Sequence, residues 1–183
     1  MITFNTADLC DENEDIKVAE PIFKSYGKYK KFSGRIRTVV AVNDNSYVKK
    51  LLEEKVNGDV MVIDGKGSTE CALLGDNLAT MGKNNGWVGF VINGYIRDVD
   101  IINNIDIGIK AIGSNPKKSV KKNIGNYRAV LNFSGISFKE GQYIYSDSDG
   151  IIVSDTNLTK DTNPNHSNSM VPYITTSCIK QYE

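Results

Sequence analysis

Residues 75–98 read GDNLATMGKNNGWVGFVINGYIRD, and the order of residue types in this stretch predicts the core of the fold. Gly-Asp-Asn is typical of a helix start, and Gly86 can end the helix that follows. Apolar residues recur at helical spacing through this segment, at Leu74, Leu78 and Met81. Residues 87–92 are then almost wholly apolar, which is typical of a buried strand.

The end of the same stretch predicts where its polar residues lie. Asn93-Gly94 is typical of a tight turn, and Arg97-Asp98 is expected at the start of the next helix. This order would bring residues 75–78 and the Arg-Asp pair to the same end of a sheet. Free backbone N–H groups, two carboxylates and a guanidinium would then lie together.

The flanking sequence extends this alternation of strand and helix. We expect a strand over residues 35–42, a helix over 47–56, a strand over 60–63, a short helix opening at Asp98 and a strand over 105–111. Three such alternations favour an α/β sheet with right-handed crossovers. The start of the chain predicts a short helix over residues 6–12.

The character of the sequence changes after residue 127. Short apolar runs separated by glycines and Asp-Ser-Asp-Gly predict strands over residues 129–133, 136–138, 143–145 and 151–153. The expected fold is thus one α/β domain over residues 1–155, with a central parallel or mixed sheet, flanking helices and a β-rich C-terminal layer. Residues 156–183 are rich in Asn, Thr, Ser and Asp and are expected to form a polar, mobile tail.

Composition excludes several classes of function. The 183 residues carry 22 basic and 22 acidic side chains, so no global field attracts nucleic acid. Three widely spaced cysteines fit a reducing compartment, and no apolar run is long enough to span a membrane, so we expect a cytoplasmic protein. The single histidine, His166, lies in the polar tail and argues against a histidine-based zinc or Ser-His-Asp site. Any metal would therefore be held mainly by oxygen, which favours Mg²⁺ or Mn²⁺.

Two further stretches have more than one interpretation. Residues 116–122 read PKKSVKK and could touch phosphates, but a solvated loop is the simpler expectation. Residues 64–69 read DGKGST, which lacks the spacing of a phosphate-binding loop, so we expect a glycine turn that shapes a pocket wall.

The residues at the expected sheet end suit a small anion and a hard cation. A helix start at residues 75–78 favours a carboxylate or enolate, and Arg97 adds a planar fork that matches a carboxylate. Asp98 could ligate a Mg²⁺ ion whose other ligands are waters and substrate oxygens. The simpler alternative is that Asp76 and Asp98 cap helices and that Arg97 forms a surface ion pair.

Asp76, twenty intervening residues and then Arg97-Asp98 form a pattern that resembles the RraA-like class II aldolase family. The likeness covers roughly residues 5–155 and leaves the tail outside. It includes further segments of the chain: Leu9-Cys10-Asp11 to Glu20-Pro21, VIDG at 62–65, DIGI at 106–109 and DGII at 149–152.

The resemblance implies a swivelling ββα domain that assembles as a ring-shaped homotrimer, sometimes stacked into hexamers. It implies that Gly75, Asp76, Asn77 and Leu78 bind a pyruvyl group, that Arg97 binds its carboxylate and that Asp98 binds Mg²⁺ or Mn²⁺. Metal and Arg97 would stabilise a pyruvate enolate, while Asp76 orients or deprotonates a water at the metal.

The family has two branches with different functions. The aldolase branch implies metal-dependent cleavage of 4-hydroxy-4-methyl-2-oxoglutarate to two pyruvates, with oxaloacetate decarboxylation through the same enolate. The regulator branch implies binding and inhibition of ribonuclease E without catalysis. Overall likeness points to the regulator branch, whereas the retained Asp98 favours the aldolase. Plentiful lysines also leave open a Schiff-base aldolase.

Overall fold

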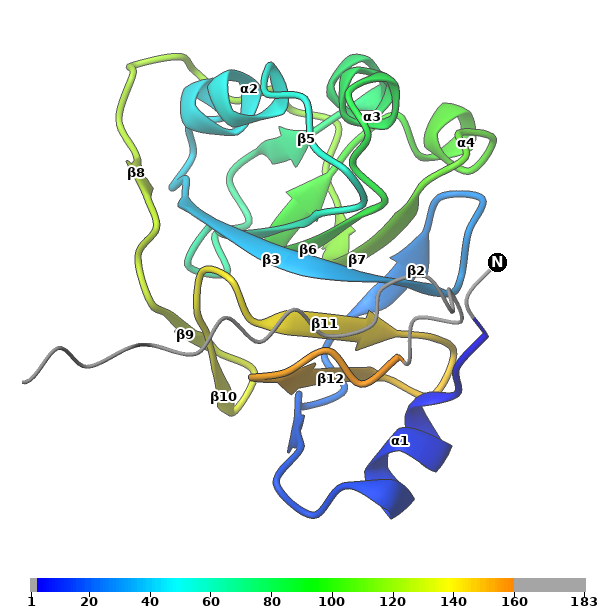
Figure 1. Ribbon diagram of the computed structural model, residues 1–183. Coiled ribbons are helices and arrows are strands. Elements are labelled where there is room, and N and C mark those ends of the chain that lie inside the picture. The colour runs from blue at the N-terminus through cyan, green and yellow to red at the C-terminus, as the bar shows by residue number, and fades with distance from the viewer. Residues whose placement is uncertain (1–2, 160–183) are drawn as a thin grey trace, which may run out of the picture.

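Parallel strands run through the centre of the molecule in the order β3–β4–β6–β7 (Figure 1). The computed structural model describes residues 3–159. The bounds of these strands are Phe32–Val40 for β3, Val60–Asp64 for β4, Gly89–Ile96 for β6 and Gly108–Ser114 for β7. Every residue of β4 is buried, because a strand inside a parallel sheet is covered on both faces.

Three helices cover one face of these strands (Figure 1). They are α2 (Ser46–Leu52), α3 (Asp76–Asn84) and α4 (Val99–Ile102). Their apolar faces pack on the sheet in a core that includes Leu52, Phe90 and Ile102. The helix predicted over residues 47–56 ends early, at Leu52, and β7 begins later than predicted, at Gly108, because Ile105 lies in the turn after α4.

A short strand, β5 (Ala72–Leu74), precedes α3 and pairs in parallel with the end of β6. Leu74 is therefore a strand residue and not part of the helix that its spacing suggested. Gly86 has a φ of +91°, which fits the predicted role of a glycine that ends α3.

The predicted turn at Asn93-Gly94 is wrong, because β6 continues through both residues to Ile96. The Asn93 side chain donates to Asp64 Oδ1 at 2.8 Å, and its carbonyl accepts from Gly65 N at 3.0 Å. These bonds to the neighbouring strand end hold the backbone extended where the local sequence favours a turn.

The opposite face of the sheet is closed by β-structure, as predicted (Figure 1). Its strands are β1 (Lys17–Val18), β9 (Leu131–Phe133), β10 (Ile136–Phe138), β11 (Tyr143–Ser146) and β12 (Ile151–Ser154). β11 pairs with the first half of β3, while the second half of β3 pairs with β4. The sheet therefore curls around a second core that contains Ile36, Phe138 and Ile144.

The remaining elements lie at the edges. α1 (Thr6–Glu12) falls where the sequence predicted it, while β2 (Lys24–Tyr26) pairs with β7 and β8 (Asn126–Tyr127) pairs with β3. The predicted class is confirmed: a mixed α/β fold with a curled sheet, few helices and a β-rich C-terminal layer.

The chain after β12 stays in contact with the domain as far as it is described. Tyr145 Oη donates to Asn157 Oδ1 at 2.9 Å and accepts from Leu158 N at 2.7 Å. Most of the expected tail, including His166 and Cys178, lies outside the described residues. Within residues 3–159, no helix has the length and apolar character needed to cross a membrane.

Candidate active site

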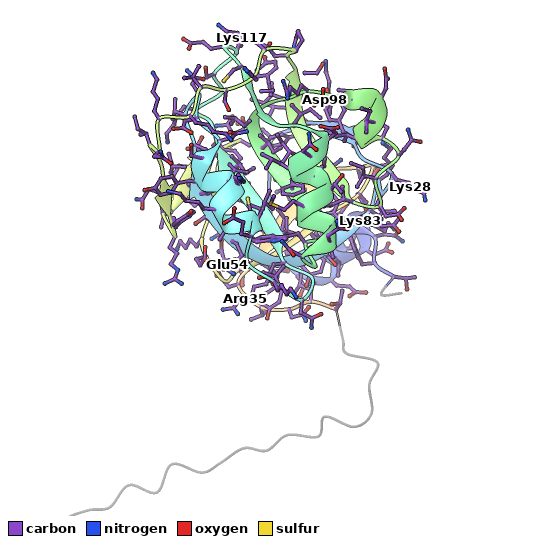
Figure 2. The ribbon with its side chains drawn as sticks, turned by 90° about the horizontal axis from the view of Figure 1, so that it is seen from above. Lys28, Arg35, Glu54, Lys83, Asp98 and Lys117 are labelled. Atoms are coloured by element: carbon purple, nitrogen blue, oxygen red, sulfur yellow. The ribbon has the colours of Figure 1, made fainter. Side chains whose placement is uncertain are left out.

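The parallel pairing of β5 with β6 brings the starts of α3 and α4 together. Leu74 lies opposite Ile96 across this pair, and Arg97 N donates to the Leu74 carbonyl at 2.9 Å. Residues 75–78 and the Arg97-Asp98 pair therefore meet at one end of the sheet, as predicted. Figure 2 shows Asp98 at this end and Arg35 and Glu54 at the other.

Asp98 lies at the N-cap of α4 in the left-handed conformation, with φ 58° and ψ 39°. Among non-glycine residues, Asp and Asn tolerate this region best. The Asp98 Oδ2 atom lies 3.3 Å from Arg97 Nε and 3.4 Å from Asp76 N. A Cβ atom on Gly75 would lie 2.7 Å from the same oxygen, so a glycine is needed for this close approach.

The start of α3 is less open than predicted. Asn77 N already donates to Asp76 Oδ1 at 2.7 Å, and Asp76 N faces the Asp98 carboxylate. Within the described residues, the N–H groups of Gly75 and Leu78 have no acceptor. Asp98 occupies the N-cap position of α4, but neither α3 nor α4 has a side-chain cap hydrogen bond, so the helix-capping alternative holds only for the position of Asp98. The helix start offers fewer free N–H groups than expected, because Asp98 and Asp76 accept from two of them.

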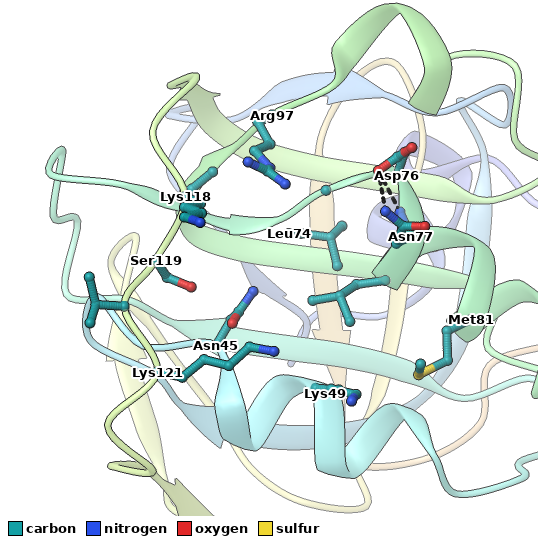
Figure 3. A pocket seen from close by; sticks show the side chains of 14 residues that line it. Asn45, Lys49, Leu74, Asp76, Asn77, Met81, Arg97, Lys118, Ser119 and Lys121 are labelled. Carbon is teal, nitrogen blue, oxygen red and sulfur yellow. Dashed lines mark hydrogen bonds between the residues drawn. The ribbon is translucent and has the colours of Figure 1, made fainter.

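The Arg97 guanidinium remains available to a ligand. Only its Nε atom pairs with Asp98, and within residues 3–159 neither terminal nitrogen has a carboxylate partner. The side chain is 36% exposed and lines a cavity of about 580 Å³. Figure 3 shows it pointing into this cavity, opposite Asp76 and Asn77 at the start of α3.

Besides Arg97, which follows β6, three parts of the chain form the walls of the cavity. Leu74 and residues 75–78 form one wall, and Asn45 and Lys49 from the start of α2 form another. The third wall is the loop after β7, which contributes Lys118, Ser119, Val120 and Lys121. Asp98 is not a lining residue, but it contacts two residues that are, Arg97 and Asp76.

The basic run at residues 116–122 is a loop, as expected, but sequence reasoning missed that it walls the site. Its position depends on a long-range contact, in which Ala72 N donates to the Lys117 carbonyl at 2.8 Å. Asn115 Nδ2 also donates to the Thr69 carbonyl at 2.6 Å. The run of lysines was the available signal, but nothing local indicates what it faces.

Asp44 fixes the far end of this loop. Its Oδ2 atom accepts from Lys122 N at 2.7 Å and Ile124 N at 3.0 Å, while Oδ1 accepts from Ser46 N at 2.8 Å. Burial opposes ionisation of Asp44, but the hydrogen bonds from Ile124, Ser46 and Lys122 outweigh it and lower its pKa to about 2. The ionised carboxylate therefore ties the loop to the start of α2.

Residues 64–69 do not form a wall of the cavity, so that prediction is wrong. Their backbone instead folds against the end of β6, where Gly65 N and Gly67 N both donate to the Asn93 carbonyl. Lys66 pairs with its neighbour Asp64 at 2.6 Å. The turn closes on its own sheet rather than on a ligand.

The residues present fit a divalent metal only as a site with one protein carboxylate. Asp98 Oδ1 accepts no hydrogen bond within the described residues, which leaves it free to bind a cation. No group of three or more acidic, histidine or cysteine side chains suited to a metal occurs within residues 3–159. Mg²⁺ often binds through one or two carboxylates and keeps several waters, so Asp98 alone meets its minimum requirement.

A Schiff-base mechanism has less support from the geometry than a metal-dependent one. Burial lowers the pKa of Lys110, as a Schiff-base lysine would require. Its Nζ, however, donates to Ser25 Oγ and to the Asp147 carbonyl, and the residue does not line the cavity. Lys110 therefore serves the packing of β2 and the β-rich layer.

Comparison with known proteins identifies the family. Residues 6–153 match the family model for RraA-like proteins, described as Aldolase/RraA. The chain belongs to the RraA-like family. The matched range contains every residue of the site described above.

The relatives of this RraA-like chain carry several names. It is 46% identical to a protein of Arabidopsis thaliana provisionally named 4-hydroxy-4-methyl-2-oxoglutarate aldolase 3, over 87% of this chain and 99% of the relative. A Geobacillus kaustophilus structure named S-adenosylmethionine: 2-dimethylmenaquinone methyltransferase is 44% identical, with a TM-score of 0.83 over 85% of this chain and 97% of that one. The RNA-processing inhibitor RraA from Thermus thermophilis is 34% identical, with a TM-score of 0.84 over 87% and 98% of the two chains.

Proposed function

We propose that this RraA-like protein is a divalent-metal-dependent aldolase that cleaves 4-hydroxy-4-methyl-2-oxoglutarate to two pyruvates and also decarboxylates oxaloacetate. The observation that carries the proposal is the placement of Arg97, whose terminal nitrogens open into a cavity beside Asp98 and the start of α3. The name of the Arabidopsis relative supports the same activity.

Arg97 and the start of α3 would hold the pyruvyl end of the substrate. The two terminal nitrogens of Arg97 can bind both oxygens of a carboxylate, which fixes its orientation as well as its position. The Leu78 N–H and the positive end of the α3 dipole favour the negative charge that develops on the 2-oxo oxygen. Gly75 and Asn77 complete this wall.

Cleavage is a retro-aldol step. The C4 hydroxyl loses its proton, the C3–C4 bond breaks, and its electron pair passes into the enolate of the first pyruvate. The second pyruvate leaves as a ketone, and the enolate takes a proton at C3. Asp76 is the proton acceptor, directly or through a water, because Asn77 occupies only its Oδ1 atom.

Asp98 would hold the divalent cation, Mg²⁺ or Mn²⁺. When bound, that ion supplies positive charge to stabilise the enolate. Asp98 also orients Arg97 through its contact with Nε, so one carboxylate serves both the metal and the substrate-binding side chain.

The decisive experiment is oxaloacetate decarboxylation by the wild type, Asp98→Ala and Asp100→Asn, measured side by side with Mg²⁺ and with EDTA. Wild type and Asp100→Asn should release pyruvate only with metal, and Asp98→Ala should lose at least about a hundredfold in kcat/KM. Asp100 is a suitable control because it is an exposed acidic residue of α4, two positions further along the chain. Metal-independent activity, or full activity in Asp98→Ala, would disprove the aldolase proposal.

Inhibition of ribonuclease E is the second candidate function, favoured by the likeness to the Thermus RNA-processing inhibitor RraA. It requires direct and saturable binding to ribonuclease E at physiological salt. Binding that survives Asp98→Ala would separate this function from catalysis, and absence of binding in a pull-down would remove it.

We further propose that the protein works in the cytoplasm as a homotrimer, or as a hexamer of stacked trimers. Cys10 and Cys71 are free thiols, which suits a reducing compartment. A trimer would let a neighbouring subunit supply further acidic ligands to the metal at Asp98.

A further inference from the structure

We propose that Lys118 and Lys121 form a second anion subsite, which binds a carboxylate at the far end of the substrate. This inference rests on the proposed function, in which Arg97 binds the 2-oxo acid end. It identifies residues that would restrict the site to dianionic 2-oxo acids.

The charge of the cavity lining is the first observation. Four cationic side chains line it, Lys49, Arg97, Lys118 and Lys121, against a single carboxylate, Asp76. The whole chain, by contrast, has no net charge. Cations gathered in one cavity repel one another, and a ligand with two negative charges relieves that repulsion better than a ligand with one.

The pairing of these cations is the second observation. Arg97 contacts Asp98, and Lys49 approaches Glu53 at 4.0 Å. Lys118 and Lys121 have no carboxylate within 4.0 Å in the part of the chain that the structure describes. Their charges therefore remain available to a ligand.

The loop that carries the two lysines is anchored on both sides of them. The Lys117 carbonyl accepts from the N–H of Ala72, which itself lines the cavity, and the Lys122 N–H donates to buried Asp44. Residues 118–121 therefore span the cavity between fixed points. Figure 3 shows Lys121 reaching into the space between this loop and α2.

The size of the cavity agrees with a second subsite. A water molecule occupies about 30 Å³ in the liquid, so a cavity of about 580 Å³ has room for far more than a three-carbon acid. Arg97 lies toward the sheet end, and Lys121 comes from the facing loop (Figure 3). An acid with a carboxylate at each end would contact both.

The same loop provides matched controls. Lys117 and Lys122 flank the subsite residues in sequence, yet neither lines the cavity. A general effect of loop charge would appear equally in Lys117→Gln/Lys122→Gln and in Lys118→Gln/Lys121→Gln. A second anion subsite predicts an effect only in the latter.

The test is calorimetric titration with two five-carbon acids, 2-oxoglutarate and 2-oxopentanoate, in the presence of Mg²⁺. The second acid has a methyl group in place of the far carboxylate. Wild type should bind 2-oxoglutarate more tightly, and Lys118→Gln/Lys121→Gln should raise its Kd about tenfold, a modest loss because both lysines are exposed. The Kd for 2-oxopentanoate should change less than about twofold, since that acid has no group for the lysines to bind.

Three outcomes would overturn the subsite: equal binding of the two acids by wild type, no binding of 2-oxoglutarate, or equal losses for both acids in the double variant. Lys118→Arg/Lys121→Arg should keep the preference, because it keeps both charges, and thermal melting should confirm that each variant is folded. The readout is binding, so it separates the two proposals. A protein that prefers the dianion but turns over no 2-oxo acid has the subsite without the aldolase activity.

Discussion

Gly75 faces the Asp98 carboxylate and the Arg97 guanidinium, and no side chain fits between them. An added Cβ would lie 2.7 Å from Asp98 Oδ2 and 3.2 Å from Arg97 Nε. Gly75→Ala should therefore displace both groups and lower kcat/KM for oxaloacetate at least about tenfold, as misplaced catalytic groups do. Its melting temperature should stay close to that of wild type, because the displaced atoms are side-chain ends at the surface.

The matched control for this change is Gly150→Ala. A Cβ there would meet no atom within 4 Å, and Gly150 is not among the glycines with positive φ. Steady-state kinetics with circular dichroism melting of both variants checks the prediction. Full activity in Gly75→Ala would show that the Arg97-Asp98 contact is dispensable.

Asp44 should make the loop that walls the site sensitive to acid. Its pKa is lowered from 3.8 to about 2 in the folded protein, so its hydrogen bonds stabilise the fold fully above pH 4 and progressively less as the pH falls toward 2. This lowering corresponds to stability on the order of 2 kcal/mol. Asp44→Asn should be less stable than wild type at pH 7 by about this amount, and the gap should close as the pH approaches 2.

Urea denaturation of wild type and Asp44→Asn between pH 7 and pH 2.5 measures this difference. Asp100→Asn serves as the control, since the Asp100 side chain is exposed and makes no hydrogen bond or ion pair within the described residues. A gap between wild type and Asp44→Asn that stays constant with pH would contradict the prediction.

Two glycines on neighbouring strands make room for one aromatic ring. Gly89 of β6 lies opposite Gly108 of β7, and a Cβ on either would clash with the ring of Phe32 from β3. Gly108→Ala should therefore lower the free energy of unfolding by about 1–3 kcal/mol, the usual cost of overpacking a core. Phe32→Leu, added to Gly108→Ala, should recover part of the loss, and urea denaturation of the single and double variants would show it.

For single helices and strands, the sequence predicted those elements in which the local pattern and the tertiary contacts agree. The all-apolar run at residues 60–63 and the helix predicted over residues 6–12 correspond closely to β4 and α1. The turn predicted at Asn93-Gly94 is absent because hydrogen bonds to Asp64 and Gly65, nearly thirty residues away, favour an extended backbone over the local turn preference. The assignment of Leu74 to a helix was wrong because β5 has only three residues, too few to show the period of two that is typical of a strand.

For the molecule as a whole, the sequence could place Arg97 and Asp98 near residues 75–78 because parallel strands bring their carboxyl ends to one edge. It could not place Lys118 and Lys121, since their position depends on the Ala72–Lys117 and Asp44–Lys122 contacts between distant segments. Under the proposed trimer, part of the site would also come from a neighbouring subunit. Asp98 offers a single carboxylate, and metal affinity rises with the number of charged ligands.

Metal binding should accordingly depend on assembly. Light scattering after size exclusion should give three or six times the 20.2 kDa mass of one chain. Mn²⁺ titrated into the assembled protein should bind at least about tenfold more tightly than into protein diluted until it is monomeric, because a neighbouring acid is then lost. Asp98→Ala should bind Mn²⁺ weakly at either dilution, and Asp100→Asn should match wild type. A monomer that binds Mn²⁺ as tightly as the assembled protein would show that Asp98 and its waters suffice, and that no neighbouring subunit takes part in the site.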